Sequence, residues 1–255
     1  MASRYWVGGT GSWSDTAHWS ESSGGAGGAA APTSADNVYF DANSFTAASK
    51  TVTIDATASC LDMDWTGATN NPILGGNDTV LKIFGNLTFI SAMSATTTTR
   101  LCFYGTAKTL TMGGLDLSSV ASYFYFLSGS RTLLDTLNVD RVTLEGGTLD
   151  TNGKAVNVAS FYITESTAKT LTLGASVITC SLDWDLTGTN VTLNADTSTI
   201  SSTRDFYGGG KTYNIGILAG NTTVTGANTF ATLTGTGTAY QTAKITFSAD
   251  QTITG

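Results

Sequence analysis

Short alternations of apolar and polar residues recur along the chain from residue 50 onward, and this pattern constrains the fold more than any other feature. In each alternation two apolar side chains lie on one face of an extended segment, with a Thr, Asn or Cys between them. The clearest examples are residues 51–54, 87–89, 101–103, 110–112, 137–139, 142–144, 156–158, 161–163, 171–173, 191–193, 213–215 and 245–247. No stretch keeps the three- and four-residue apolar spacing of an amphipathic helix over helical length. The sequence therefore predicts an all-β protein.

A longer period lies above this alternation. Steps of 23, 38 and 22 residues, of which two are close to 22, separate Leu110, Leu133, Leu171 and Leu193. Residues 108–113 and 169–174 nearly repeat each other, and residues 50–55 and 251–255 are weaker copies. A period near 22 with two or three short strands per unit is typical of one coil of a parallel β-solenoid, or β-helix. About ten such coils, stacked at the ordinary strand spacing, form a rod roughly 50 Å long.

Composition agrees with many short strands joined by turns. The 255 residues include 29 Gly and only 2 Pro, and charged residues make up 12%. A chain rich in Thr, Val and Gly favours pleated surfaces and tight turns over helices. A β-sandwich is the alternative fold, but it prefers longer strands and hairpin turns, and Asn152-Gly153 is the one clear hairpin-type pair.

Residues 1–48 differ from residues 49–255, and we interpret them as an N-terminal cap on a solenoid body. Trp6, Trp13 and Trp19, three of the five Trp, recur around a Gly-rich segment. Trp buries a large area at low entropic cost, so such a cluster is suited to covering the open end of a core. A sugar-binding aromatic platform is the functional alternative for these three residues.

Charge and cysteine content exclude several functions. The formal net charge is −7 and no run of Lys or Arg occurs, so neither nucleic acid nor an anionic membrane is an expected partner. No apolar run is long enough to span a membrane, and the N-terminus lacks the pattern of a secretory signal.

Cys60, Cys102 and Cys180 lie far apart in apolar runs and are expected to be free, buried thiols. With His18 as the single histidine, we expect neither metal nor cofactor.

Two pairs of aspartates are the weak catalytic candidates. Asp62 and Asp64 are two residues apart, and Asp183 and Asp185 repeat the arrangement beside Trp184. A spacing of two puts both carboxylates on one face of a strand, as glycoside hydrolysis requires of its acid and its base or nucleophile. The opposing interpretation is that the repeated phrase reflects a repeated structural unit with the same solvated surface.

Two loop motifs point to chemistry only superficially. Residues 150–153 (Asp-Thr-Asn-Gly) resemble part of a calcium loop but lack the downstream Glu, and an Asx turn explains them equally. Residues 208–212 (Gly-Gly-Gly-Lys-Thr) lack the first glycine of a phosphate-binding loop, and no helical pattern follows them. We interpret this second segment as a turn.

The aromatic run 123–126 (Tyr-Phe-Tyr-Phe) is predicted to form a strand with Phe124 and Phe126 in the core. Tyr123 and Tyr125 then face outward. Three roles are open for them: local packing, contact with another subunit, or stacking on a sugar ring.

Several short segments, spread over most of the chain, are similar to segments of a known class of proteins. They are residues 5–15, Trp19, 24–27, Pro32, Asp36, 38–41, 64–68, 85–88 and 207–213. Together they resemble Gly/Thr-rich repeat modules of phage virion proteins, found in tail fibres and on particle surfaces. The Trp-Val-Gly-Gly opening is also similar to the start of β-solenoid adhesins of the autotransporter type. The resemblance implies a structural role at a virion surface or outside the cell, and it brings no catalytic signature.

The leading expectation is a non-enzymatic β-solenoid module of a phage tail fibre, spike or surface decoration that contacts or faces the host. A polysaccharide depolymerase using the Asp pairs is one alternative, and a self-assembling extracellular fibre or bacterial surface adhesin is another. The expected partners are further copies of the chain (a trimer or an end-to-end stack), other virion proteins and a host-surface glycan. Because the chain ends within a strand-like pattern, we expect a neighbour or a further segment to cover that edge.

Overall fold

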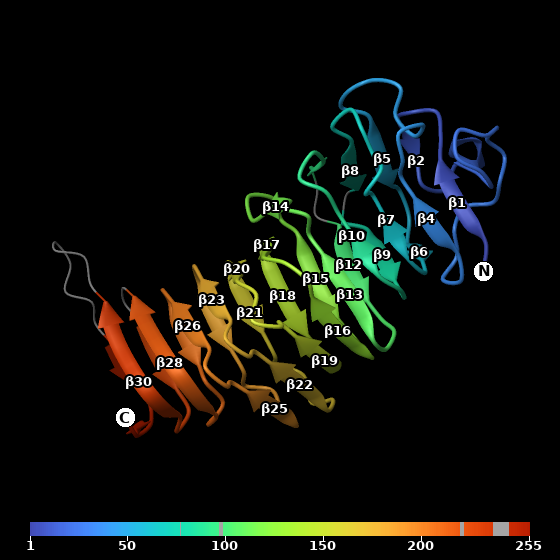
Figure 1. Ribbon diagram of the computed structural model, residues 1–255. Helices are drawn as coiled ribbons and strands as arrows, with labels where there is room; N and C mark the ends of the chain where they lie inside the picture. The colour runs from blue at the N-terminus through green and yellow to red at the C-terminus, as the bar shows by residue number, and fades with distance from the viewer. Residues whose placement is uncertain (77, 97–98, 220–221, 237–244) are drawn as a thin grey trace.

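The computed structural model describes residues 1–76, 78–96, 99–219, 222–236 and 245–255. These residues form an all-β parallel solenoid of about nine turns, with the coils ranged side by side from the N-terminus to the C-terminus (Figure 1). The one helical element among them is a single 3-10 turn, η1 (Thr16–His18). Because strands of successive coils pair in parallel, the predicted solenoid is confirmed and the β-sandwich alternative is excluded.

Three faces run along the solenoid, and most coils contribute one strand to each, although the last coils contribute none to sheet A. Sheet A is made of β1 (Ser3–Trp6), β3 (Trp19–Ser20), β4 (Asn37–Tyr39), β7 (Met63–Asp64), β10 (Leu87–Thr88), β13 (Lys108–Thr111), β16 (Ser130–Leu133), β19 (Gly147–Asp150), β22 (Lys169–Thr172) and β25 (Val191–Asn194).

Sheet C forms a second face of ten strands. It is made of β6 (Ala58–Cys60), β9 (Val80–Ile83), β12 (Arg100–Phe103), β15 (Tyr123–Phe126), β18 (Arg141–Leu144), β21 (Ser160–Tyr162), β24 (Asp183–Asp185), β27 (Asp205–Tyr207), β29 (Thr222–Thr225) and β31 (Ile245–Phe247).

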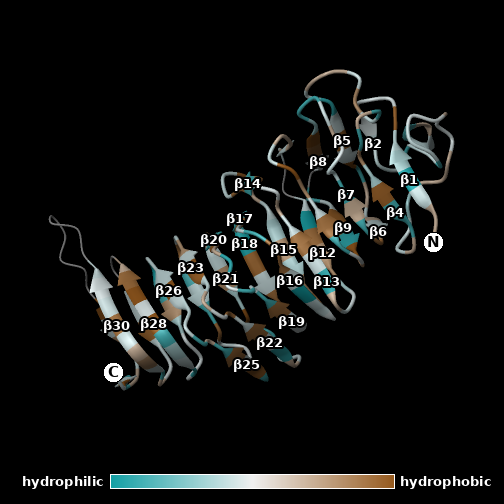
Figure 2. Cartoon of the chain, viewed as in Figure 1, coloured by the Kyte–Doolittle hydropathy of each residue, from teal (hydrophilic) through white to brown (hydrophobic). Residues whose placement is uncertain are grey.

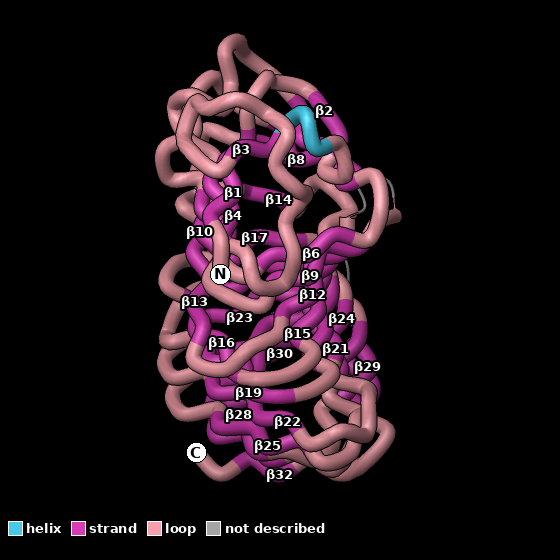
Figure 3. Tube along the Cα trace, turned by 90° about the vertical axis from the view of Figure 1, so that its right-hand side faces the viewer, coloured by secondary structure: helices cyan, strands magenta, loops and turns pink. Residues whose placement is uncertain are grey.

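The third face is divided between two sheets. Sheet B holds β2 (Gly11–Ser12), β5 (Thr51–Ile54), β8 (Ile73–Gly76) and β11 (Ser94–Ala95). Sheet D holds β14 (Asp116–Leu117), β17 (Leu137–Val139), β20 (Val156–Val158), β23 (Val177–Cys180), β26 (Thr199–Ser202), β28 (Thr212–Ala219), β30 (Thr229–Thr236) and β32 (Thr252–Ile253). Viewed toward its N-terminal end, the chain winds around one interior, with strands on each side and loops at the corners (Figure 3).

The repeat found in the sequence corresponds to this stacking. Leu149, Leu171 and Leu193 lie directly above one another on sheet A, one coil apart. The 38-residue gap between Leu133 and Leu171 contains an additional coil, in which Leu149 lies between Arg131 and Leu171. Coil length therefore varies while the alternation of inward and outward residues persists.

Inward-facing apolar residues build one continuous core. They alternate along each strand with outward polar residues, so brown and teal bands succeed each other across the faces (Figure 2). On sheet C, Phe124, Phe126, Phe161, Trp184 and Phe206 are all buried. Burial of one such side chain contributes roughly 1.5–3 kcal/mol, and the stacked coils repeat this contribution along the whole solenoid.

The Trp-rich N-terminal cluster covers the first coil. Strand β3 folds back antiparallel onto β1, so that Trp6 lies opposite Trp19. The Trp6 indole donates a hydrogen bond to the Gly9 carbonyl (2.7 Å), and the Trp19 indole donates one to the Trp13 carbonyl (2.7 Å). The predicted boundary after residue 48 interrupts no sheet, since β4 pairs with both β1 and β7. Cap and body therefore share one core.

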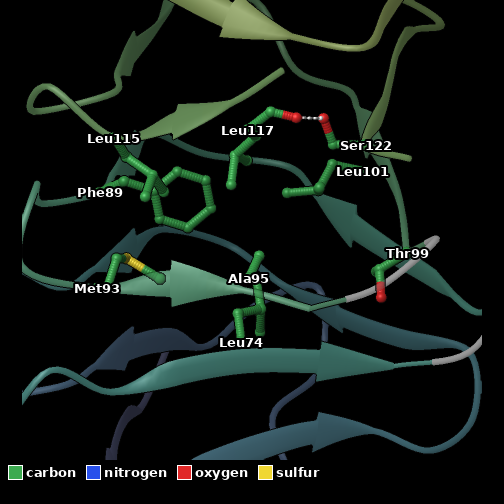
Figure 4. A pocket seen from close by; sticks show the side chains of 9 residues that line it. All are labelled: Leu74, Phe89, Met93, Ala95, Thr99, Leu101, Leu115, Leu117 and Ser122. Carbon is green, nitrogen blue, oxygen red and sulfur yellow. Dashed lines mark hydrogen bonds between the residues drawn. The ribbon is translucent and has the colours of Figure 1, made fainter. Parts of the chain in front are cut away.

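The interior is interrupted at the seam between sheets B and D. Within the described residues no strand ladder joins β11 to β14. Apolar side chains line a cavity of about 10 Å³ at this seam (Figure 4). The residues around it are Leu74, Phe89, Met93, Ala95, Thr99, Leu101, Leu115, Leu117 and Ser122. A space of this size holds at most one water molecule, so it is a packing defect and no ligand site.

Residues 208–211 form a turn, as predicted, and strand β28 follows them directly. Gly209 has a φ of +61°, and a Cβ added there would lie 2.1 Å from the Leu186 carbonyl oxygen. Both facts require glycine. The turn takes the place of a sheet A strand, and sheet A ends at β25, where the Lys211 ammonium donates to the Val191 carbonyl (2.8 Å).

Replacing Trp19 tests the cap. Trp19→Ala removes a fully buried indole that packs edge-on against Trp6 and Trp13. We expect it to lower the free energy of unfolding in urea by about 3–5 kcal/mol. The control, Thr170→Ala on the outer surface of sheet A, is expected to change it by less than about 0.5 kcal/mol. Equal effects of the two substitutions would contradict a stabilising cap.

Asp36 gives the cap a pH dependence. Its carboxylate accepts hydrogen bonds from the Thr33 hydroxyl (2.7 Å), the Thr33 amide (3.0 Å) and the Ala2 amide (3.1 Å). These bonds, that of the Thr33 hydroxyl first, lower the pKa of Asp36 below its ordinary value. The contribution of the Asp36 carboxylate to the free energy of unfolding is complete above about pH 4, the pKa of Asp36 in the unfolded chain. It is lost as the pH falls through the lower pKa of Asp36 in the folded protein.

Asp36→Asn should therefore flatten the dependence of the thermal midpoint on pH below about pH 4. Melting curves followed by circular dichroism across this range measure it. A variant whose midpoint falls as steeply as that of the unaltered protein would refute the assignment.

Candidate functional site

The two Asp pairs lie on different faces of the solenoid. Asp62 directly precedes β7 of sheet A, and Asp64 lies in that strand. Asp183 and Asp185 lie in β24 of sheet C. The interpretation that the repeated phrase reflects a repeated surface is therefore wrong. The two phrases share local chemistry, but they occupy different positions in the coil.

Each of the four carboxylates is engaged in the fold. Asp64 accepts from the Thr66 amide (2.8 Å) and hydroxyl (2.5 Å), and Asp185 accepts from the amide (2.9 Å) and hydroxyl (2.7 Å) of Thr187. Asp and a Thr two residues later thus close the same turn after both strands. The Asp62 carboxylate accepts from the Asn86 amide of the next coil (2.7 Å).

Asp183 is the most constrained of them. Its side chain is 6% exposed, and it accepts hydrogen bonds from both Nε (2.8 Å) and Nη2 of Arg204. The Tyr162 hydroxyl of the preceding coil donates a further bond to it (3.1 Å). The Asp183 carboxylate in turn raises the pKa of the Arg204 guanidinium. This carboxylate links three coils, and that is a structural role.

Strand β15 places its aromatic residues as predicted. Phe124 and Phe126 are buried in the core, and Tyr123 and Tyr125 face outward and are half-buried. The Arg141 guanidinium lies 4.8 Å from the centre of the Tyr123 ring and 5.2 Å from that of Tyr162. Arg141 thus makes cation–π contacts with Tyr123 and with Tyr162 of the neighbouring outward row, which also holds Tyr125.

That row of sheet C alternates long and short side chains from coil to coil. The register places Tyr125 beside Thr143, Thr143 beside Tyr162, Tyr162 beside Asp185, and Asp185 beside Tyr207. We call Tyr125, Tyr162 and Tyr207 the tyrosine row. Thr143 points outward but is only 9% exposed. Since an outward side chain is buried only when neighbours cover it, side chains adjacent to Thr143 shield it from water.

Burial, together with the neighbouring Asp205 carboxylate, raises the pKa of Tyr207. The Tyr207 phenol is therefore neutral at physiological pH. Tyr162 and Tyr207 did not emerge from the sequence as site residues. Each follows a buried Phe on its strand, which signals that it faces outward. Placing them in one row, however, requires the coil register.

The remaining sequence candidates are structural. The indoles of Trp6, Trp13 and Trp19 are buried, which favours the cap over the sugar platform for these residues. Asp150 accepts from the Asn152 amide (2.8 Å) in an Asx turn with positive φ at Asn152 and Gly153. No cluster of three metal-ligating side chains occurs in the described part of the chain. The three cysteines are free and buried, as predicted, and burial raises the pKa of each thiol.

Comparisons with protein-family models, curated proteins and solved structures return no match to this chain. None of the helical residues that the structure describes forms a segment long and apolar enough to cross a membrane. Function must therefore be argued from the faces of the solenoid themselves.

The contacts of Asp183 predict a measurable contribution to stability. Asp183→Ala leaves the Tyr162 hydroxyl and the Arg204 guanidinium without their acceptor, so we expect a loss of about 1–3 kcal/mol in urea unfolding. The matched control is Glu21→Ala, which removes a carboxylate 80% exposed and 3.9 Å from Arg4. Exposed pairs contribute little, so a change below about 1 kcal/mol is expected there. A control effect as large as that of Asp183→Ala would argue against the structural role.

Proposed function

We propose that this chain is a non-enzymatic structural and adhesive β-solenoid module of a phage particle, displayed in a tail fibre, spike or surface decoration that faces the host. The observation that carries the proposal is the outer surface of sheet C, where the tyrosine row lies on a rigid support. A ladder of backbone hydrogen bonds between coils holds each of these side chains at a fixed place along the axis.

The positions of the carboxylates argue for this function over a depolymerase. Hydrolysis of a glycosidic bond needs two carboxyl groups that flank one substrate bond. The Asp pairs lie on separate sheets, and within the pair on sheet C Asp183 is buried under Arg204 and Tyr162. A general acid or base must reach its substrate, and the contacts of Asp183 oppose that.

Surface chemistry supports the location and partners that belong to the proposal. The net charge of −7 and the low content of charged residues suit an extracellular or virion surface that does not bind nucleic acid. We propose other virion proteins, a host-surface glycan and further copies of this chain, as a trimer or an end-to-end stack, as the partners. The self-assembling fibre and the bacterial adhesin named above use the same module in another assembly.

The test separates binding from cleavage. The purified chain is incubated with capsular and exopolysaccharide preparations of candidate hosts, and both co-sedimentation and new reducing or unsaturated ends are measured. We expect binding without new ends. Release of ends that disappears in Asp183→Asn or Asp185→Asn would replace the adhesive function with a depolymerase.

A further inference from the structure

We propose that the outer surface of sheet C binds a neutral, extended, β-linked polysaccharide of the host surface that runs parallel to the solenoid axis. Sugar rings stack on Tyr125, Tyr162 and Tyr207. This inference rests on the adhesive function proposed above and names the class of its ligand.

The first argument is spacing. Members of the tyrosine row lie on β15, β21 and β27, every second coil of sheet C. Since neighbouring strands lie about 4.8 Å apart, successive rings of the row are about 10 Å apart along the axis. In an extended β-1,4-linked chain, which has two sugars per repeat, this is close to the advance over one repeat. Every second sugar therefore meets a ring in the same orientation.

The second argument is that the rings are held in place before a ligand binds. Tyr125, Tyr162 and Tyr207 are each half-buried, so part of each side chain packs against the sheet. Tyr162 is fixed by its hydrogen bond to Asp183 (3.1 Å) and by the Arg141 guanidinium against its ring. A ligand that binds such side chains immobilises few rotatable bonds, so little affinity is lost to ordering. Tyrosine also joins an apolar face to a polar hydroxyl, which matches the mixed surface of a sugar.

The third argument is charge. Around the row lie the cations Arg141 and Arg204 and the carboxylates of Asp183, Asp185 and Asp205. These groups nearly balance, so the surface does not attract a polyanion. The Asp185 carboxylate lies between Tyr162 and Tyr207 in the row and has lone pairs to accept from sugar hydroxyls. Neutral sugars are the ligands that such a surface favours.

Sheet D provides an internal contrast. Its corresponding outward row carries Asn138, Asn157, Thr179, Ser201 and Ile217, without an aromatic ring. The side-chain Nδ2 of Asn157 donates to the side-chain Oδ1 of Asn138 (2.7 Å), so the polar side chains of these two residues already satisfy each other. Face-specific binding is therefore expected of sheet C.

Isothermal titration calorimetry with oligosaccharides of defined length tests the proposal. The probes are cellohexaose and chitohexaose, with maltohexaose as the α-linked control and a polyuronate as the anionic control. We expect binding of a β-linked hexasaccharide, weaker binding of the tetrasaccharide and still weaker binding of the disaccharide, because each further pair of sugars reaches another ring. The control oligosaccharides are expected not to bind.

Variants connect this binding to the row. Tyr125→Ala, Tyr162→Ala and Tyr207→Ala should each weaken hexasaccharide binding about three- to tenfold. Tyr162→Phe keeps the ring but loses the bond to Asp183 that holds it in place, so its binding should lie between that of the unaltered protein and that of Tyr162→Ala. Tyr39→Ala, which removes a half-buried ring of sheet A stacked on Tyr5, is the matched control and should bind as the unaltered protein does. Circular dichroism and melting curves identify any variant that does not fold, and the Leu variant at that position, which keeps an apolar side chain but no ring, then replaces it in the comparison.

Binding of the β-linked hexasaccharide that is insensitive to the three Ala substitutions would overturn the proposal, as would no β-linked binding at all. Binding of maltohexaose or of the polyuronate in its place would also overturn it. The adhesive function would survive each of these results if the chain still co-sediments with host polysaccharide without cleaving it.

Discussion

Parallel hydrogen bonding between successive coils is the interaction on which the rest of the structure depends. Except for β3, which is antiparallel to β1, the strands of sheets A, C and D pair in register with their counterparts one coil away, as at Leu149, Leu171 and Leu193. This pairing fixes which side chains face the core and which face water, because neighbours along a strand alternate. It also aligns outward residues of different coils into rows. Core, cap and candidate site are all consequences of this one constraint.

The sequence predicts the fold well because the core residues alternate with polar residues along each strand, and this alternation is visible in the sequence. It predicts the site only in part, because outward positions carry no such constraint. Tyr125 is recognisable between Phe124 and Phe126, but its row partners depend on how many residues each coil contains. The 38-residue gap after Leu133 conceals an extra coil, and the two similar Asp phrases lie on different faces. Register partners on sheet A are 23 residues apart at Leu110 and Leu133 but 18 apart at Arg131 and Leu149, so coil length varies without disturbing the core.

Buried charge is the other feature that the alternation does not reveal. Arg131, the second residue of β16 in sheet A, points into the solenoid and is 3% exposed. Its guanidinium donates to the carbonyls of Thr109 (3.0 Å) and Tyr104 (3.0 Å) and lies 4.7 Å from the centre of the Phe103 ring. Burial lowers the pKa of Arg131 to about 10. An Arg inside is tolerated because the corner between sheets C and A leaves carbonyl groups that need donors. The Arg131 guanidinium thus supplies hydrogen-bond donors to backbone carbonyls at this corner.

A solenoid converts chain sequence into positions at a constant axial spacing, and this property decides what its faces can recognise. A compact ligand needs side chains that converge around it. The rows of side chains on a flat sheet run parallel and do not converge. A polymer with its own repeat needs the opposite arrangement, in which equivalent groups recur at a fixed distance. The alternation of Tyr125, Thr143, Tyr162, Asp185 and Tyr207 supplies that recurrence on sheet C. Because the backbone ladder sets the distance, a substitution in the row changes the strength of binding but leaves the spacing intact.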